Sequence, residues 1–359
     1  MKKIVFLLPN NASKPVGGVK VVLEYANRLA ADGYNVELVY GAYTRWMTSS
    51  PLHLLYYLLA FVGQLITGSY RPEWYALDKR VEQRLVWSHA RYHYPKDAII
   101  VATAVDTAWY LNRYALPKEQ KYYLIQDFED WFVDDDFVRE TYHYAMHKIV
   151  ISRWLQKVVE DCGETADLVP NGFDFHFFSL TTPVEKRVAT EVIALYHTDK
   201  RKGLDVAFEA FRLSKERVPQ LHVTLFGTPA CPDNLPDWIE YHQRPDKETF
   251  NRIYNRAAIF VGSSYTEGWG LTVGEAMQCG CAVACTDNKG YLEMAKDGET
   301  ALVSPVGDAK ALANNIVRLT EDDVLRCRIA DNGYQFIHQF DVEKSYEEFK
   351  GIIIIGKAV

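Results

Sequence analysis

The sequence predicts an α/β fold built from two doubly wound domains. Short apolar strands alternate with amphipathic helices along the chain, a pattern typical of parallel sheets. The length of 359 residues is sufficient for two domains with separate cores. The clearest unit is 260–285, where an apolar strand, a glycine-rich turn, a short helix and a second strand follow one another.

Composition and charge exclude some classes of protein. The chain has 48% hydrophobic and 24% charged residues, as a globular protein does. Its formal net charge of −7 argues against nucleic acid as a partner, because nucleic-acid-binding domains usually carry a basic excess. The cysteines lack metal-ligand spacing, and Cys279, Cys281 and Cys285 resemble small core residues. We therefore expect reduced thiols in a cytoplasmic protein.

The first domain is expected to span 1–170. Its first strand is 4–8, because this apolar run is too short for a signal peptide and polar residues follow it directly. A glycine turn then leads into a helix, and a second strand completes a β-α-β unit. The strands expected here are 4–8, 35–39, 98–104, 122–125 and 148–152, and the helices are 19–31, 137–147 and 153–161.

Residues 52–66 form an apolar run, LHLLYYLLAFVGQLI. It is too short for a membrane span, which needs about 20 residues. Two interpretations stay open: a buried core helix, or an amphipathic surface that touches a bilayer or a lipid-linked acceptor. The second interpretation would place the protein on the inner face of the plasma membrane.

Two patterns were candidates for metal ligands, and we expect neither to bind a metal. Asp134, Asp135 and Asp136 contain a D-x-D pattern, but we interpret them as a solvated turn that opens the following helix. His143 and His147 have the i, i+4 spacing of one helix face, yet the sequence offers no third ligand.

The second domain is expected to span 171–340. Its strands and helices alternate regularly, and the helix at 308–319 has apolar residues at i, i+4 and i+7. For the tail GIIIIGKAV, a final strand stays an open alternative. The strands expected here are 192–196, 222–226, 259–261, 282–285 and 301–304, and the helices are 247–257, 271–279, 308–319, 325–336 and 342–349, with a further helix starting at 204.

Two carboxylates frame the glycine-rich turn: Glu267 lies before the helix and Glu275 inside it. The amides of Gly270, Leu271 and Thr272 lack partners within the helix and lie at its positive end, so they suit a phosphate. Glu275 lies one turn into the helix, where its oxygens can accept hydrogen bonds from a diol. An anion site between two hydroxyl acceptors fits a sugar joined to a nucleoside through phosphate. The alternative is a solvated loop followed by a surface helix.

The segment EGWGLTVGEAMQCG, in which Glu267 and Glu275 flank seven residues, resembles the E-x7-E signature of retaining glycosyltransferases of family 4. That family has the GT-B fold, in which two Rossmann-like domains face a cleft. The resemblance implies that Glu267 contacts the donor sugar and that Glu275 contacts the ribose. Gly268 and Trp269, inside the same turn, are expected to belong to the donor site.

Further segments resemble the same family. Gly17 and Gly18 resemble its N-terminal glycine loop, although two glycines alone mark only a tight turn. VPNGFD, ending at Asp174, resembles its segment at the crossing between domains. The C-terminal segment 341–359 resembles its closing helix, which packs back on the first domain.

Lys202 precedes a helix and is a natural partner for a diphosphate. Relatives in the family carry an arginine five residues before this lysine. Here that position is His197, so the role of the arginine falls to His197 or Arg201.

The end of the strand 122–125 departs from the family pattern. Many relatives carry a His-Asp pair there, whereas this chain has Gln126 and Asp127. Ligands of open α/β sheets gather at the carboxyl ends of strands, so Asp127 is expected on the acceptor side. The QDFE run resembles a subgroup that includes rhamnosyltransferases of bacterial surface polysaccharides.

The resemblance therefore implies a retaining hexosyltransferase. It would move a sugar from a UDP-, dTDP- or GDP-sugar to a glycan or lipid-linked acceptor in bacterial surface polysaccharide synthesis, without a metal or other cofactor. The catalytic candidates are Glu267, Asp127 and Lys202. The expected donor site comprises Gly18, His197, Arg201, Lys202, Gly268, Trp269, Gly270, Leu271, Thr272 and Glu275.

Two alternatives stay open. The replacement of expected groups by Gln126 and His197 suggests a non-catalytic scaffold in a polysaccharide assembly complex. A sugar-nucleotide epimerase with the same fold is the other alternative.

Overall fold

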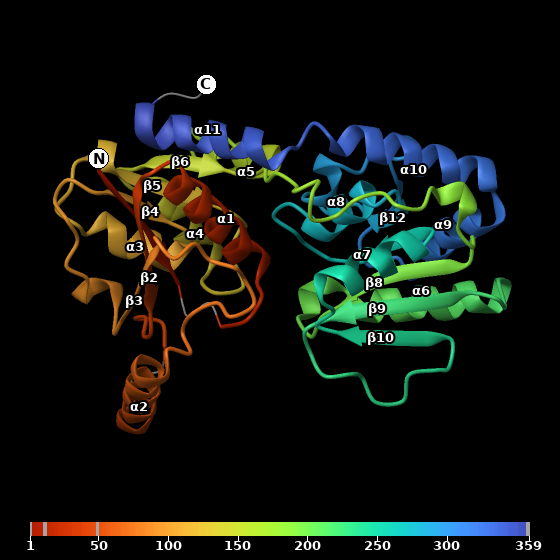
Figure 1. Cartoon of the computed structure of the whole chain (residues 1–359), viewed down its shortest axis with the longest axis horizontal. Helices are drawn as coiled ribbons and strands as arrows, with labels where there is room; N and C mark the ends of the chain where they lie inside the picture. Colours follow the sequence, from red (N-terminus) through yellow and green to blue (C-terminus); the bar gives the residue numbers. More distant parts are fainter. Residues whose placement is uncertain (1, 10–12, 48–49, 357–359) are drawn as a thin grey trace. The chain divides into compact units, whose positions relative to one another are not determined.

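The computed structural model describes residues 2–9, 13–47 and 50–356. The chain divides into two compact units (Figure 1). The first unit contains Met1–Pro170 and Glu343–Val359, and the second contains Asn171–Val342.

The first unit is a seven-stranded parallel sheet in the order β3-β2-β1-β4-β5-β6-β7. Its central strands are continuous apolar runs, because helices cover both faces of a doubly wound sheet. The strands are β1 (Lys3–Leu8), β2 (Asn35–Gly41), β3 (Glu82–Val86), β4 (Ile99–Ala102), β5 (Lys121–Ile125), β6 (His147–Val150) and β7 (Asp167–Leu168). The helices are α1 (Gly17–Ala31), α2 (Pro51–Thr67), α3 (Val105–Asn112), α4 (Asp135–Tyr142), α5 (Arg153–Asp161) and α11 (Val342–Ile355).

The second unit is a six-stranded parallel sheet in the order β10-β9-β8-β11-β12-β13. One apolar core joins these strands to α6, α9 and α10. The strands are β8 (Glu191–Tyr196), β9 (His222–Gly227), β10 (Ile239–Gln243), β11 (Ile259–Gly262), β12 (Ala282–Thr286) and β13 (Leu302–Ser304). The helices are α6 (Leu204–Arg217), α7 (Lys247–Arg256), α8 (Leu271–Gln278), α9 (Ala309–Glu321) and α10 (Asp323–Ile337). The two sheets confirm the predicted α/β class.

The helix predicted over 137–147 is too long. Helix α4 ends at Tyr142, and His147 instead begins β6, where it pairs with the neighbouring strand β5. His143 and His147 therefore do not share a helix face. Asp134 caps α4 by accepting the N–H of Phe137 at 2.8 Å, which confirms the acidic run as the opening of this helix.

Helix α2 shows that residues 52–66 are not a buried core helix. None of its residues is buried, and Leu52 and Ile66 are 81% and 80% exposed. The helix projects away from the sheet of its own unit (Figure 1). Across the described ranges, no helix is both long and apolar enough to cross a membrane.

Helix α11 continues beyond the predicted end at residue 349 to Ile355, so a strand is wrong for the start of the tail. The helix persists because its apolar side chains, including Phe349 and Ile352, are buried. The ring of Phe349 stacks on Tyr25 of α1, with 4.5 Å between ring centroids. The last three residues of the tail lie outside the described residues.

The chain enters and leaves the second unit side by side. Phe173 and Asp341 form a parallel bridge. The N–H of Phe173 donates to the carbonyl of Phe340 at 2.8 Å, and the N–H of Val342 donates to the carbonyl of Phe173 at 3.2 Å.

His89 is a fully buried histidine at the carboxyl end of the first sheet. Its Nε2 donates to the carbonyl of Leu8, the last residue of β1, at 2.8 Å, while Nδ1 is buried and has no hydrogen-bond partner within the described part of the chain. Burial lowers the pKa of His89 to about 4 from the ordinary value of 6.5. The folded state thus favours the neutral ring.

This histidine should make stability depend on pH. Because the folded pKa lies below the unfolded one, the unfolded state binds more protons, and stability is lost as pH falls from 6.5 toward 4. In His89→Gln the amide can still donate to Leu8 but cannot titrate. Between pH 7 and 4 we expect wild type to lose about 3 kcal/mol relative to this variant, measured by urea unfolding. The exposed His93→Gln is the matched control, and a difference that stays constant with pH would contradict the assignment.

Candidate active site

The turn between β11 and α8 is the centre of the candidate site. Strand β11 ends at Gly262, residues 263–270 form the turn, and α8 begins at Leu271. Gly270 precedes the helix with a φ of 98°, which glycine adopts without strain. A Cβ atom at Gly270 would lie 2.5 Å from Cδ1 of Tyr291. Glycine therefore allows Tyr291 to pack directly against the turn.

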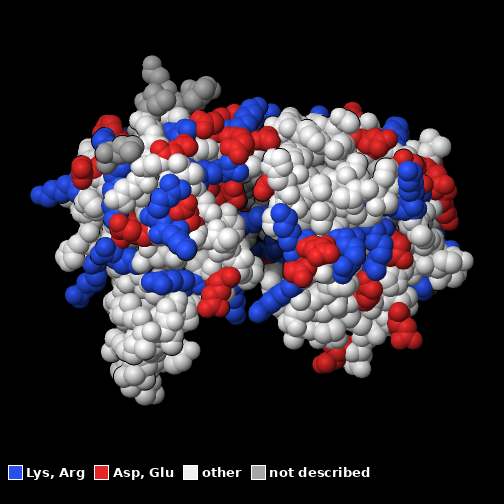
Figure 2. Space-filling view, in the orientation of Figure 1, with Lys and Arg blue, Asp and Glu red and all other residues white. Residues whose placement is uncertain are grey.

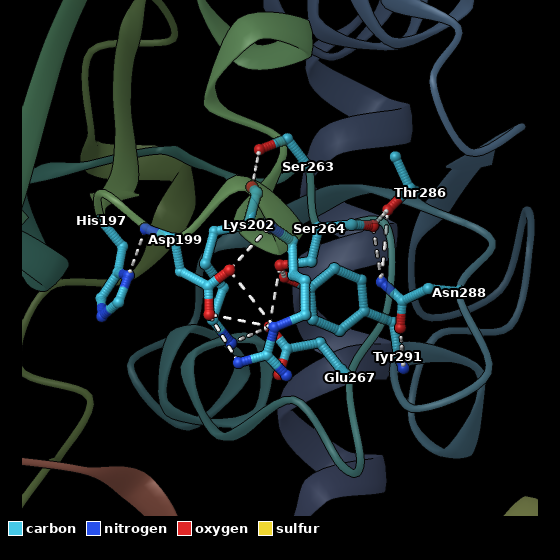
Figure 3. Close-up of polar contacts among 10 residues, drawn as sticks. His197, Asp199, Lys202, Ser263, Ser264, Glu267, Thr286, Asn288 and Tyr291 are labelled. Atoms are coloured by element: carbon cyan, nitrogen blue, oxygen red, sulfur yellow. Dashed lines mark hydrogen bonds and ion pairs between the residues drawn. The ribbon is translucent and has the colours of Figure 1, made fainter. Parts of the chain in front are cut away.

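Lys202 and Glu267, predicted separately from the sequence, meet at this turn (Figure 3). Lys202 ends a short 3-10 turn after β8, and its Nζ donates to Oε1 of Glu267 at 2.7 Å. The hydroxyl of Ser264 donates to the same oxygen at 2.8 Å. The side chains of Lys202 and Glu267 are 23% and 14% exposed, so solvent and ligand can reach the pair. Within the described residues, Oε2 of Glu267 has no hydrogen-bond partner and stays available to a ligand.

Three side chains at and after the end of β12 hold the turn in place (Figure 3). Thr286 and Asn288 donate to the carbonyl of Ser264 at 2.6 and 3.1 Å. The hydroxyls of Tyr291 and Ser264 lie 2.9 Å apart, and burial raises the pKa of Tyr291 well above its ordinary value. Because Ser264 also contacts Glu267, this network positions the carboxylate. The sequence did not predict this network, although the polar residues at the carboxyl end of β12 were an indication of it.

Arg201 and His197, which the sequence predicts to hold phosphate, both contact Asp199. The guanidinium of Arg201 donates to Oδ2 of Asp199 through Nε at 3.0 Å. Nδ1 of His197 accepts the N–H of Asp199 at 3.0 Å. Burial, and then the nearby charge of Lys202, lowers the pKa of His197. The ring is therefore neutral at neutral pH, and its free proton lies on Nε2.

Other residues of the predicted donor site have different surroundings. The indole of Trp269 is 3% exposed and meets the ring of Phe340 edge-on at 5.1 Å, so it is a core side chain. Its Nε1 is buried and has no hydrogen-bond partner among the described residues, and a contact of Trp269 with the donor stays a prediction. Gly268 lies buried within the turn, and Glu275 lies on α8 with 9% exposure.

The start of α8 has the amide arrangement that the sequence predicted. The carbonyl of Gly270 accepts from Val273 and Gly274 at 3.0 and 3.3 Å, which places Leu271 and Thr272 in the first helical turn. Their N–H groups have no acceptor inside the helix. Both residues are half-buried, as a ligand-accessible helix terminus requires.

Gly18 and Asp127 belong to the first unit. Gly18 is the second residue of α1, and a Cβ there would lie 3.2 Å from the amide of Gln126. The structure thus brings Gly18 beside the end of β5, which Asp127 follows. Oδ1 of Asp127 accepts the N–H of Phe128 at 2.9 Å. A shared site with Glu267 stays a prediction.

The part of the chain that the structure describes contains no group of three or more His, Cys, Asp or Glu residues that could hold a metal ion. The cysteines at 279, 281 and 285 are buried, which confirms them as core residues.

Part of the second unit matches the model of a protein family. Residues 177–336 match the family model of glycosyl transferases group 1. The putative glycosyltransferase EpsD of Bacillus subtilis (strain 168) is 27% identical over 151 residues, which cover 40% of each chain. The phosphatidyl-myo-inositol mannosyltransferase of Mycolicibacterium smegmatis is 23% identical over 193 residues, which cover 51% of this chain and 50% of that protein. The chain thus spans about half the length, or less, of these curated relatives.

Similar solved structures cover nearly the whole chain. Sucrose-phosphate synthase from Thermosynechococcus elongatus has a TM-score of 0.72 at 20% identity and covers 98% of both chains. Anabaena Alr3699/HepE, solved with UDP and glucose, has a TM-score of 0.72 at 16% identity and covers 98% of this chain and 99% of that one. TarM has a TM-score of 0.73 at 12% identity and covers 99% of both chains. These likenesses show the GT-B fold.

Proposed function

We propose that this chain is a retaining glycosyltransferase that moves a hexosyl group from a nucleotide-diphosphate sugar to a glycan or lipid-linked acceptor, without a metal ion. The contact between Lys202 and Glu267 beside the start of α8 carries the proposal. It lies within the segment that matches the glycosyl transferases group 1. Matched relatives from Staphylococcus aureus and Erwinia amylovora are named for capsular polysaccharide and amylovoran biosynthesis, which supports bacterial surface polysaccharide as the product.

The charges of the site suit the departure of a diphosphate. In the reaction the bond between the anomeric carbon and the diphosphate oxygen breaks, so negative charge grows on the leaving diphosphate. The ammonium of Lys202 and the free amides of Leu271 and Thr272 would stabilise this charge. His197 would add a neutral N–H donor, whereas Arg201 would have to share its contacts with Asp199.

The two glutamates would hold the donor at its two ends. Oε1 of Glu267 already accepts from Lys202 and Ser264, so Oε2 would accept from hydroxyls of the transferred sugar. Glu275, further along α8, would accept from the hydroxyls of the ribose. Gly18 and Asp127 of the first unit are proposed for the acceptor side, and Asp127 is the third catalytic candidate.

Donor binding tests the proposal directly. UDP-, dTDP- and GDP-sugars, including a rhamnosyl donor, would be screened by thermal shift and then titrated by calorimetry in excess EDTA. UDP-sugars come first, because a structural neighbour was solved with UDP-glucose. Replacing Glu275 by alanine removes a charged acceptor and should weaken the donor that binds by about 1.5–3 kcal/mol, or roughly 10- to 150-fold.

A matched Glu275→Gln variant preserves the shape of the side chain and separates loss of charge from loss of packing. Unchanged donor affinity in Glu275→Ala would exclude this residue from the site. The alternatives give different results: a scaffold would bind none of the nucleotide sugars, and an epimerase would release an epimerised donor in the absence of an acceptor.

A further inference from the structure

Helix α2 (Pro51–Thr67) of the first unit presents an unusual apolar surface. Eight of its large apolar side chains are 43–81% exposed, among them Leu52, Leu55, Leu59 and Ile66. The helix contains no Asp, Glu, Lys or Arg. In Figure 2 it is the white protrusion that carries neither blue nor red side chains. Exposed apolar surfaces of this extent usually mark an interaction site.

The helix is held firmly at its inner side. Tyr57 packs on Tyr43 with 5.9 Å between ring centroids, and Phe61 meets Trp87 edge-on at 5.7 Å. Tyr43 and Trp87 themselves stack at 5.1 Å, so they form one aromatic base. The outer side chains of α2 are therefore presented by an ordered helix.

The exposed apolar surface of α2 is too broad to fit a simple groove on a partner protein. At about 100° per residue, the exposed apolar positions cover roughly half of the helix circumference. A helix that packs against a protein surface usually presents an apolar stripe of about 100° or somewhat more. A medium that surrounds the helix fits this distribution better than a groove on a partner protein.

Cations stand at both ends of the helix in the chain. Arg45 precedes α2 and Arg71 follows it, and both side chains are exposed. Among the described residues neither Arg45 nor Arg71 forms an ion pair; each lies over an aromatic ring instead, Arg45 over Trp109 at 4.4 Å and Arg71 over Tyr70 at 5.4 Å. Figure 2 shows Lys and Arg side chains on the body of the unit next to the base of the protrusion. Aromatic and basic residues beside an apolar element suit the headgroup layer of an anionic membrane.

We propose that α2 inserts into one leaflet of an anionic lipid bilayer, with Arg45 and Arg71 at the headgroups. Seventeen residues give a helix of about 25 Å, longer than one leaflet of a hydrocarbon core of about 30 Å. Both arginines therefore reach the headgroups of the same leaflet when α2 lies along the membrane interface, which anchors the protein without spanning the membrane. The inference goes beyond glycosyl transfer, and it stands or falls on lipid binding alone.

Vesicle flotation of the full chain tests the proposal. Wild type should float with vesicles of phosphatidylcholine and phosphatidylglycerol, and less with phosphatidylcholine alone. Leu55→Glu/Leu59→Glu should lower the bound fraction at least tenfold, because two charges enter the apolar surface. The matched control is Val188→Glu/Val324→Glu in the second unit, whose side chains are 63% and 79% exposed; it should float as wild type does.

Two further measurements keep the result independent of folding defects. Hydrogen exchange of 51–67 in wild type should slow when anionic vesicles are added, while that of 309–321 stays unchanged. Arg45→Gln/Arg71→Gln should remove the preference for anionic vesicles. Wild type that stays unbound, or Leu55→Glu/Leu59→Glu that floats equally well, would overturn the proposal. Wild type that does not float but forms a dimer without lipid, with the dimer abolished in Leu55→Glu/Leu59→Glu, would make α2 a contact between copies. That result would also overturn the proposal.

Discussion

A Glu267→Gln enzyme should lose about 10- to 150-fold in kcat/KM for glycosyl transfer, which corresponds to about 1.5–3 kcal/mol. Glutamine keeps the shape of the side chain and can still accept from Ser264 or Lys202 through its one carbonyl oxygen. It removes the charge that holds the ammonium of Lys202, and it replaces one acceptor oxygen by a donor. The loss should appear in initial rates at subsaturating donor.

Two comparisons show whether this loss comes from the site. Glu299→Gln changes an exposed glutamate of the same unit and should leave the rate unchanged. Lys202→Met, alone and combined with Glu267→Gln, should give losses that are less than additive, because both variants break one contact. A Glu267→Gln enzyme with wild-type kcat/KM would exclude the carboxylate from the reaction.

Gly270→Ala is expected to cost about 2–5 kcal/mol of stability and to abolish donor binding. An alanine at a φ of 98° is strained by about 1–2 kcal/mol. Its Cβ would also lie 2.5 Å from the ring of Tyr291, and overpacking of this kind costs about 1–3 kcal/mol. Moving Tyr291 disturbs Ser264, and through it Glu267.

Gly298 provides a matched control for this substitution. It has a φ of 71°, and a Cβ there would meet nothing within 4 Å, so Gly298→Ala isolates the backbone strain. Urea unfolding should therefore show a smaller loss for Gly298→Ala, of about 1–2 kcal/mol, and calorimetry should show intact donor binding. Equal losses of stability for the two variants would mean that Tyr291 moves away from the new methyl group without lowering the free energy of unfolding.

The elements that the sequence predicts well are those with local signals. The strand, glycine turn, helix and strand at 260–285 correspond to β11, α8 and β12. The first β-α-β unit was predicted equally well, as β1, α1 and β2. In each case a continuous apolar run ends at glycine or polar residues, so the pattern itself marks both ends of the strand.

Other elements depend on partners that the sequence does not reveal. Strands β3 (EQRLV) and β10 (IEYHQ) lie at the edges of their sheets. Both contain polar residues, and the sequence predicted neither strand. Apolar composition could not tell whether 52–66 is covered by protein or left exposed. His147 has a spacing compatible with a helix, but pairing with β5 draws it into a strand.

The same distinction holds for the candidate site. Glu267 and Lys202 follow from motifs beside helix starts, and the structure brings them within 2.7 Å. The hydrogen bonds that hold the turn around Glu267 could not be predicted, because Ser264 contacts Thr286 and Tyr291, which lie 22 and 27 residues away in the sequence. Trp269 was predicted at the donor site from its place in the turn, and the packing of its indole against Phe340 could not be predicted from the sequence.

The position of α11 has a consequence for the order of events on the ribosome. Phe349 is fully buried against Tyr25, so the first unit lacks part of its interior until residue 349 has been synthesised. The ribosome must add residues 171–349 first, which takes roughly 10–40 s at about 5–20 residues per second. The second unit is one uninterrupted stretch and can mature during that delay. Synthesis of the first unit thus begins before that of the second unit and ends after it, and during the delay the incomplete first unit would be a substrate for a chaperone.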